Sequence, residues 1–304
     1  MPKNGVEQKP SETAMFAAIR RAIANKEYKS EKFGPDYMAE FFLPAHFKFF
    51  LRFKKIRAIT NNKLNSFLPG LNEYMIARTA YFDSLFVNAL NSKTAQIVLL
   101  GAGYDSRAYR FAKSNLGTTV FELDIAPTQD KKMECLRKAR ISIPKHVTFV
   151  PIDFNKEPLK DALEKAGYKS HQKTLFIWEG VSYYLDAKSV DSTLEFVSHA
   201  SHHESAIAFD YTISISEENI DEYYGVKDFA KTMAERHENE ELMFSIDEGE
   251  TELFLEQRGL RMINHLDNQE IEGTFLLDEN GSLIGQITGH FRFVMATPEE
   301  TPKK

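Results

Sequence analysis

Residues 97–111 read IVLLGAGYDSRAYRF, and this stretch decides the fold. An apolar run ends at Leu100, glycines follow at positions 101 and 103, and a segment of helical character starts at Asp105. A buried strand that leads through a glycine turn into a helix is typical of nucleotide-binding α/β proteins. Because Gly101 and Gly103 have no side chain, backbone amides can approach a ligand closely at this turn.

Four more apolar runs follow this first one. They lie at residues 119–123, 147–152, 174–178 and 206–209. Amphipathic segments long enough for crossover helices alternate with them, at residues 105–114, 127–139, 157–166 and 187–200. Short, fully apolar runs between helices are typical of buried strands, so we expect an α/β fold with a doubly wound, Rossmann-like, mostly parallel sheet. Later strand-like runs lie near residues 261–267, 271–277 and 290–296, with a hairpin turn signal at 278–281.

The segment before the first strand has helical periodicity, with apolar residues recurring at spacings of three and four from Thr13 to Leu90. We therefore expect a single domain over residues 13–297. Its parts are a helical cap, a cofactor-binding core, an acidic lid-like insertion and C-terminal strands, at residues 13–92, 95–211, 212–256 and 257–297. The polar, proline-containing ends, residues 1–12 and 298–304, are expected to be disordered tails.

Composition excludes several classes of protein. The 304 residues carry 38 basic and 44 acidic side chains, a net charge of 38 − 44 = −6, which argues against general binding to nucleic acid. A single cysteine, Cys135, can form neither an internal disulfide nor a multi-thiolate metal site. Residues 1–25 lack a signal-peptide pattern, and no apolar run is long enough to span a bilayer. We expect a cytoplasmic protein without stable membrane insertion.

Charge is unevenly distributed along the chain. Residues 216–252 hold 13 acidic and 3 basic side chains, a net of −10, whereas residues 47–57 alternate phenylalanines with lysines and arginines and contain no acid. The favoured interpretation is two solvated helical faces, the second with its aromatic side chains packed inward. The alternatives are a lid or channel pair beside the active site and, for the basic segment, binding to a membrane surface.

Acidic residues end three of the predicted strands. Asp124 ends the second and lies 124 − 103 = 21 residues after Gly103, where a carboxylate can accept both hydroxyls of a ribose. Asp153 and Phe154 follow the third, where they could meet an adenine amino group and ring, and Glu179 follows the fourth. Three acids at neighbouring strand ends predict a negative crevice, which suits a sulfonium cofactor better than a pyrophosphate.

Four strings now resemble a known family. They are IVLLGAGYDSRAYRF, FELD, VPIDF and LFIWEGVSYYL, at residues 97–111, 121–124, 150–154 and 175–185. In this order and spacing, they resemble the leucine carboxyl methyltransferase family of class I S-adenosylmethionine-dependent methyltransferases, over residues 13–211. The resemblance implies the class I methyltransferase fold, S-adenosylmethionine as methyl donor, S-adenosylhomocysteine as product, and no metal.

The resemblance also implies roles for residues around the methionine part of the cofactor. Arg78 is expected to pair with the methionine carboxylate, and Glu179 to face the methionine amino group. Gly101 and Gly103 are expected to pass beneath the methionine portion. A basic residue of the first helix, Arg20 or Arg21, could approach the cofactor as well, but the short motif there does not fix the register.

The nucleoside part has its own expected residues. Asp124 is expected to hold the ribose, while Asp153 and Phe154 frame the adenine. For the acceptor, Tyr184 is the candidate that orients the substrate, because Tyr183 and Tyr184 follow Glu179 on the active edge.

A general base is needed for a phenol or alcohol acceptor but not for a carboxylate, which is already ionised at neutral pH. His202 and His203, beside Glu204, are the visible candidates. They precede the fifth strand, at the end opposite the active crevice, so a solvated helix terminus is the favoured interpretation. A zinc site with His199 is disfavoured by the loose spacing and the lack of a thiolate.

We therefore expect an S-adenosylmethionine-dependent O-methyltransferase that acts on a carboxylate, or a hydroxyl, of a small molecule or peptide. Ser106 and Arg107 stand where the eukaryotic carboxyl methyltransferase typically has two threonines, which argues against protein phosphatase as substrate. One alternative is an NAD-dependent oxidoreductase, which would use Gly101, Gly103 and Asp124 but leave the other strand-end acids without a role. The other is a non-catalytic cofactor-binding protein of the same fold. The sequence does not indicate an oligomeric state.

Overall fold

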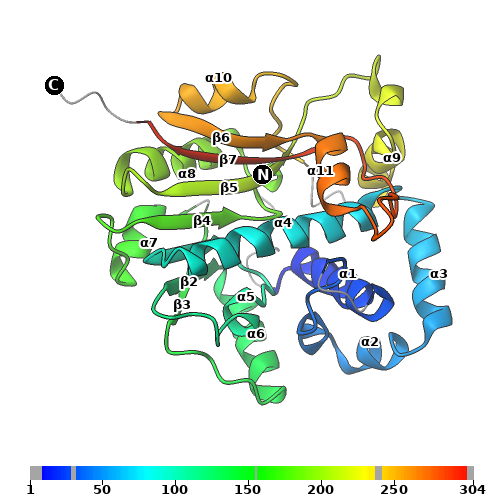
Figure 1. Ribbon diagram of the computed structural model, residues 1–304, viewed down its shortest axis with the longest axis horizontal. Helices are drawn as coiled ribbons and strands as arrows, with labels where there is room; N and C mark the ends of the chain where they lie inside the picture. The colour runs from blue at the N-terminus through cyan, green and yellow to red at the C-terminus, as the bar shows by residue number, and fades with distance from the viewer. Residues whose placement is uncertain (1–8, 29–31, 155, 237–241, 300–304) are drawn as a thin grey trace.

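A seven-stranded sheet forms the centre of the computed structural model, which describes residues 9–28, 32–154, 156–236 and 242–299 (Figure 1). Its strands are β1 (Gln96–Leu100), β2 (Thr119–Asp124), β3 (Val147–Pro151), β4 (Thr174–Trp178), β5 (Ala206–Thr212), β6 (Leu260–Leu266) and β7 (Phe291–Pro298). The order is β3-β2-β1-β4-β5-β7-β6. The first five strands are parallel, and β7 is antiparallel to both β5 and β6. This confirms the predicted doubly wound, mostly parallel sheet.

Helices cover both faces of this sheet. The helices of the N-terminal region are α1 (Glu12–Tyr28), η2 (Ala39–Phe42), α2 (Ala45–Phe50), α3 (Lys54–Asn65) and α4 (Leu71–Asn91), of which α1 and α4 pack on the sheet. Between the parallel strands lie α5 (Arg107–Arg110), α6 (Ala126–Lys138), α7 (Leu159–Lys165), η3 (Ser182–Tyr184) and α8 (Ala187–Ala200). After β5 follow η4 (Ile220–Glu222), α9 (Val226–Arg236), α10 (Thr251–Glu256) and α11 (Asn268–Phe275). None of the helices in the described ranges is long and apolar enough to cross a membrane.

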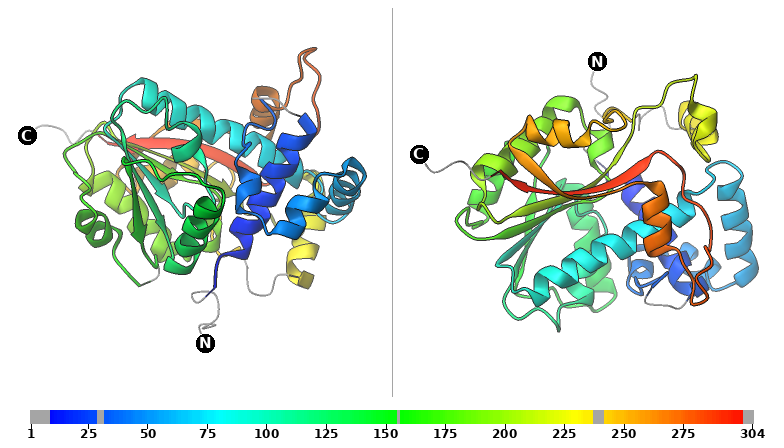
Figure 2. Two further views of the ribbon diagram at one scale, coloured as in Figure 1. Left: turned by 90° about the horizontal axis from the view of Figure 1, so that it is seen from below. Right: turned by 45° about the horizontal axis from the view of Figure 1, so that its top comes forward.

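Two hydrophobic cores lie on opposite sides of the sheet. One core joins α1, α4, α6 and α11 to one face, and the other joins α7, α8 and α10 to the opposite face. Helix α4 crosses the first face, with α1 beside it (Figure 2). It starts after Gly70, whose φ of 77° and close approach to the Thr288 backbone exclude a side chain. This packing directs α4 side chains to the carboxyl edge of the strands.

The predicted strand at 271–277 is wrong, because these residues mostly form helix α11. Asp267 accepts a hydrogen bond from the Glu270 N–H, and the Glu270 side chain accepts one from the Asp267 N–H. This capping box stabilises the first turn of a helix. The predicted turn at 278–281 forms, but it joins only an isolated bridge between Leu277 and Leu283.

The inward packing predicted for the aromatic side chains of the basic segment is wrong for three of four phenylalanines. Phe47 is partly buried against the core and Leu51 is fully buried. Phe47 lies on the inner side of α2 and Leu51 directly follows that helix, whereas the side chains of Phe49, Phe50 and Phe53 lie away from the core. Their exposed fractions are 54%, 47% and 48%.

Candidate active site

The glycine turn after β1 lies at the carboxyl edge of the sheet. Gly101 has a φ of 70°, and a β-carbon there would stand 2.5 Å from Cγ2 of Val181 in the turn after β4. Gly103 has a φ of 44°, and a β-carbon there would stand 3.0 Å from Cβ of Ala14 on α1. Both glycines are therefore required by their conformation and their neighbours. The turn runs between the N-terminal cap and the β4 end of the sheet.

Asp124 lies beside this turn, at the end of β2. Its Oδ2 accepts a hydrogen bond from the Gly103 N–H at 2.6 Å, and its Oδ1 accepts one from the Ile125 N–H at 2.7 Å. Burial raises the pKa of the Asp124 carboxyl, although these backbone donors oppose the shift. The Thr128 side chain also hydrogen-bonds to this carboxylate, and the remaining acceptor capacity of its two oxygens suits a further donor, such as a ribose hydroxyl.

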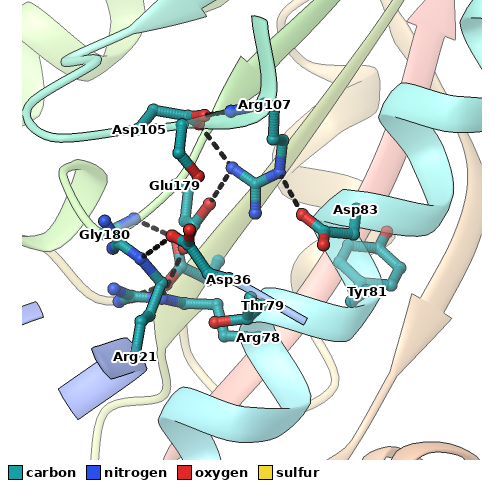
Figure 3. A network of polar contacts seen from close by, with 12 residues as sticks. Arg21, Asp36, Arg78, Thr79, Tyr81, Asp83, Asp105, Arg107, Glu179 and Gly180 are labelled. Carbon is teal, nitrogen blue, oxygen red and sulfur yellow. Dashed lines mark hydrogen bonds and ion pairs between the residues drawn. The ribbon is translucent and has the colours of Figure 1, made fainter. Parts of the chain in front are cut away.

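Arg78 of α4 and Glu179 after β4 form an ion pair at the same edge (Figure 3). The Arg78 Nε lies 3.1 Å from the Glu179 Oε1, and both side chains are largely buried. A β-carbon on Gly180 would stand 2.8 Å from the Arg78 Nη1, so glycine leaves the space that the guanidinium fills. The pair presents one positive and one negative group side by side.

Asp210, at the end of β5, is a second carboxylate beside Arg78. It is fully buried, lies 3.4 Å from the Arg78 Nη1 and accepts hydrogen bonds from the Gly180 N–H and the Tyr74 hydroxyl. Arg78 also donates to the Tyr183 hydroxyl at 3.2 Å. Burial, followed by the charge of Asp210, raises the pKa of both Tyr74 and Tyr183 well above the usual value. Both phenols therefore stay protonated at neutral pH.

Arg107 of α5 extends this network on the other side of Glu179. It lies 2.7 Å from the Glu179 Oε2 and 2.7 Å from the Asp83 Oδ1, and it also pairs with Asp105 (Figure 3). Burial would lower the pKa of Arg107, but Asp105, Glu179 and Asp83 raise it well above the usual value. Conversely, Arg107 is the main charge that lowers the pKa of Asp105 against the effect of burial. The guanidinium thus fixes three carboxylates from three elements.

Arg110 and Arg21 complete the network towards the cap. Arg110 lies 2.7 Å from Asp83 and 3.5 Å from Asp36, and Arg21 of α1 lies 2.9 Å from Asp36. Arg21 also donates to the Tyr104 carbonyl at 2.7 Å, directly after the glycine turn. Helix α1 is therefore tied to the turn by a charged side chain.

These arginines balance one of the three acids of the predicted negative crevice, Glu179, whereas Asp124 and Asp153 lie outside their network. The network joins four arginines and five carboxylates, a net charge of 4 − 5 = −1: Arg21, Arg78, Arg107 and Arg110 with Asp36, Asp83, Asp105, Glu179 and Asp210. Most of the acidic charge of this network is thus neutralised by its own arginines. The sequence analysis did not assign Asp36, Asp83, Asp105 or Asp210 to the site. Arginines three residues apart at 107 and 110 were the available signal, because such residues share one helix face.

Asp153 and Phe154 follow β3, next to Asp124 in the sheet, where Asp124 pairs with Pro151. The Asp153 carboxylate lies 3.0 Å from the Lys156 Nζ, and Phe154 packs partly buried against the core of the opposite face. Tyr184 is also partly buried, and its ring centroid lies 4.8 Å from that of Tyr183. Arg78 contacts Tyr183, which the sequence analysis did not choose as the residue that orients the substrate. The adenine and substrate roles of these residues remain predictions.

The histidine pair lies away from this edge. His202, His203 and Glu204 precede β5 and are exposed or partly exposed, and their potential ligand atoms lie within 4.8 Å of one another. This position is at the amino end of β5, as the sequence analysis expected. The group is therefore separated by the length of the strand from Asp210 at its carboxyl end.

Comparison with known proteins gives consistent results. The model of the family described as "Leucine carboxyl methyltransferase" matches residues 14–198. A Bacillus subtilis protein named "Putative S-adenosyl-L-methionine-dependent methyltransferase YktD" is 31% identical over 220 residues, which cover 71% of this chain and 70% of that protein. A Frankia alni protein with the same functional name is 40% identical over 123 residues, which cover 40% of this chain and 42% of that protein.

Two solved structures resemble the whole fold. One is a methyltransferase of Thermobifida fusca, described as putative in its title, with a TM-score of 0.56, 13% identity and 99% of each chain covered. The other is a DUF574 family protein of Streptomyces avermitilis, with a TM-score of 0.59, 14% identity, and coverage of 96% of this chain and 99% of that chain. At this level of identity, the two structures support the fold alone.

Proposed function

The chain belongs to the leucine carboxyl methyltransferase family and is an S-adenosylmethionine-dependent methyltransferase; from this premise we propose that it methylates a carboxylate oxygen of a small molecule or peptide. The observation that carries the proposal is the buried Arg78–Glu179 pair beside the glycine turn. The amino acid end of the donor carries one carboxylate and one ammonium group. The pair offers the complementary charge to each of them.

The residues around the turn fit the other parts of the donor. Gly101 and Gly103 leave the space in which backbone can approach the methionine portion, and a β-carbon at either position would meet a neighbour. The Asp124 carboxylate has acceptor capacity for ribose hydroxyls. Asp153 and Phe154, after the neighbouring strand, would contact the adenine. These assignments follow the order of β1, β2 and β3 in the sheet.

Methyl transfer needs the two reactants held in line and screened from water. S-adenosylmethionine supplies an electrophilic methyl group, which the acceptor oxygen takes up as S-adenosylhomocysteine leaves. Arg78 and Glu179 orient the donor's charged end, and Tyr184 is our candidate for the residue that orients the acceptor. Cover comes from residues 242–244, where the Met243 N–H donates to the Tyr183 carbonyl at 2.8 Å.

A carboxylate acceptor fits the chemistry of this centre better than a hydroxyl. A carboxylate is ionised at neutral pH and needs no base, whereas an alcohol or phenol usually needs one. The buried phenols of Tyr74 and Tyr183 have a raised pKa and cannot take up a proton at neutral pH. Two carboxylates lie beside Arg78 at this centre, Asp210 and Glu179. Both are held in ion pairs with Arg78, so neither is placed as a base for an alcohol.

The acceptor class can be tested by the stability of the product. Purified protein is incubated with methyl-tritiated donor and a panel of small carboxylic acids, each paired with the corresponding alcohol. A methyl ester hydrolyses in mild alkali and releases volatile methanol, whereas a methyl ether does not. We expect radioactivity that becomes volatile after alkali treatment, with the acids only. Incorporation that resists alkali, or that occurs with the alcohols, would contradict carboxyl methylation.

A further inference from the structure

A cluster of exposed aromatic and basic side chains lies where α2 meets α3. We call it the basic aromatic corner and define it by Phe49, Phe50, Arg52, Phe53, Lys54 and Lys55. It belongs to the part of the cap that lies on the side of the molecule opposite the C-terminal end of β7 (Figures 1 and 2). None of its residues belongs to the charged network of the active site. The methyl transfer proposed above assigns none of these residues a role.

The three phenylalanines form one exposed apolar group. The ring centroids of Phe49 and Phe50 are 5.7 Å apart, and those of Phe49 and Phe53 are 5.4 Å apart. About half of each side chain is exposed. Single exposed apolar residues are common on protein surfaces, but a contiguous exposed group rimmed by polar residues marks an interaction site.

The charge of this segment is of one sign. Residues 41–72 contain six lysines and arginines and no aspartate or glutamate, in a chain whose net charge is −6. Arg57 is buried and pairs with Glu27 on α1. In the described part of the chain, no carboxylate lies within ion-pair distance of Arg52, Lys54 or Lys55. The corner therefore presents uncompensated positive charge around an apolar centre.

We propose that the basic aromatic corner binds the surface of an anionic lipid bilayer, with its phenylalanines at the level of the lipid headgroups. Clustered aromatic rings flanked by lysine and arginine are typical of segments that lie in the membrane interface. Each cation near an anionic leaflet strengthens such binding, and long basic side chains reach the headgroups while their stems stay in apolar surroundings. Three cations without a carboxylate partner favour an anionic lipid surface as the partner.

The test is co-sedimentation of the full-length protein with vesicles of phosphatidylcholine alone and with phosphatidylglycerol added. We expect binding to the anionic vesicles that weakens as salt is raised, and little binding to phosphatidylcholine alone. The variant Phe49→Ser/Phe50→Ser/Phe53→Ser should bind anionic vesicles at least ~10-fold more weakly. The variant Lys54→Glu/Lys55→Glu should lose ~10-fold or more as well.

Matched controls separate this surface from a general effect of charge or apolarity. Leu116→Ser/Ile263→Ser/Leu283→Ser removes three other exposed apolar side chains, and Lys138→Glu/Lys160→Glu reverses two other exposed lysines. Both controls should bind vesicles as the unchanged protein does. Equal thermal unfolding temperatures would show that the variants are folded.

Tryptophan fluorescence can show whether the basic aromatic corner itself contacts the vesicles. In Phe50→Trp, the new indole should shift to shorter wavelength on anionic vesicles, while Trp178 is fully buried and gives a constant background. Absence of vesicle binding, or binding that the corner variants leave unchanged, would overturn the proposal. Self-association or nucleic acid binding that the corner variants abolish, without vesicle binding, would overturn it in favour of that partner. None of these results depends on the identity of the methyl acceptor.

Discussion

Glu179 is the residue on which the two halves of the charged network depend. One of its oxygens meets Arg78 and the other meets Arg107, so a single side chain holds guanidinium groups from α4 and α5. A carboxylate in this position can exchange one of these contacts for the ammonium group of a ligand without losing both. We therefore expect Glu179 to combine its structural role with the proposed ligand-binding role.

Replacing Glu179 by glutamine should weaken S-adenosylhomocysteine binding by about 10- to 100-fold, because a charge-assisted hydrogen bond contributes about 1.5–3 kcal/mol. Isothermal titration calorimetry measures the change. Glu134→Gln is the matched control, since Glu134 also pairs with two cations, Lys131 and Lys138, but on the exposed side of α6. Equal affinities in the two variants would contradict the assigned role of Glu179.

The variant Gly101→Ala tests whether the glycine turn contacts the donor. In Gly101→Ala, the new methyl group would meet Val181 at 2.5 Å, in a left-handed conformation that disfavours alanine by about 1 kcal/mol. The control, Gly167→Ala, has a φ of 91° but no atom within 4 Å of the added carbon. We expect both variants to lose stability in urea unfolding, with at least ~1 kcal/mol more lost in Gly101→Ala. Only Gly101→Ala should lose donor binding; retained binding would mean that the turn does not contact the donor.

A histidine, His290, lies in the core directly before β7. His290 is buried between the rings of Phe229 and Phe291, and its Nδ1 lies 3.1 Å from the Thr288 hydroxyl. Burial, and then the charge of Arg292, lowers the pKa of His290 to about 3. A folded-state pKa below the unfolded value of 6.5 stabilises the fold above pH 6.5, and this stabilisation is lost as the pH falls towards 3.

The unfolding free energy should therefore fall by about 1 kcal/mol more between pH 7.5 and pH 5.5 in the unchanged protein than in His290→Gln. Urea titrations at the two pH values measure this difference. His171→Gln, which changes an exposed histidine, should keep the dependence of the unchanged protein. An identical pH dependence in His290→Gln would show that His290 does not titrate in this way.

Local signals explain which elements could be predicted. The strands β1 to β5 are mostly apolar runs with turn or helix signals at their ends, and the sequence places them closely. Helix α11 was missed, although Asp267 and Glu270 carry the spacing of a capping box, because the apolar residues that follow also suit a strand. The short α2 was misjudged because its inner side is set by only Phe47 and Leu51.

Across the whole molecule, the active site assembles from distant parts of the chain. Asp124 and Glu179 could be predicted because each directly follows or ends an apolar run, and Asp124 also has the expected spacing from Gly103. The partners of Arg107 could not be predicted, because Asp83 and Glu179 come from α4 and the end of β4 and meet only after the sheet forms. The sequence and the resemblance together therefore selected Glu179 and Arg78, which pair with each other, but not Arg107 as the second partner of Glu179.

Positive and negative charge are concentrated in different parts of the molecule. The cap carries the basic aromatic corner, whereas the chain after β5 carries the net charge of −10 over residues 216–252, of which 237–241 lie outside the described residues. The Tyr183 contact of Met243 brings part of this acidic chain to the active site. A segment with this net negative charge disfavours highly anionic acceptors through its long-range field, so we expect acceptors with one carboxylate to be preferred over those with several.

The methyl-donor site at the glycine turn is tested by calorimetric titration of S-adenosylmethionine into the unchanged protein and into Asp124→Asn. We expect a Kd in the micromolar range for the unchanged protein, a loss of at least ~10-fold in Asp124→Asn, and no loss in Asp130→Asn on the exposed side of α6. NAD should give no binding heat. Equal donor affinity in the Asp124 variant, or tighter binding of NAD, would contradict a methyl-donor site at the glycine turn.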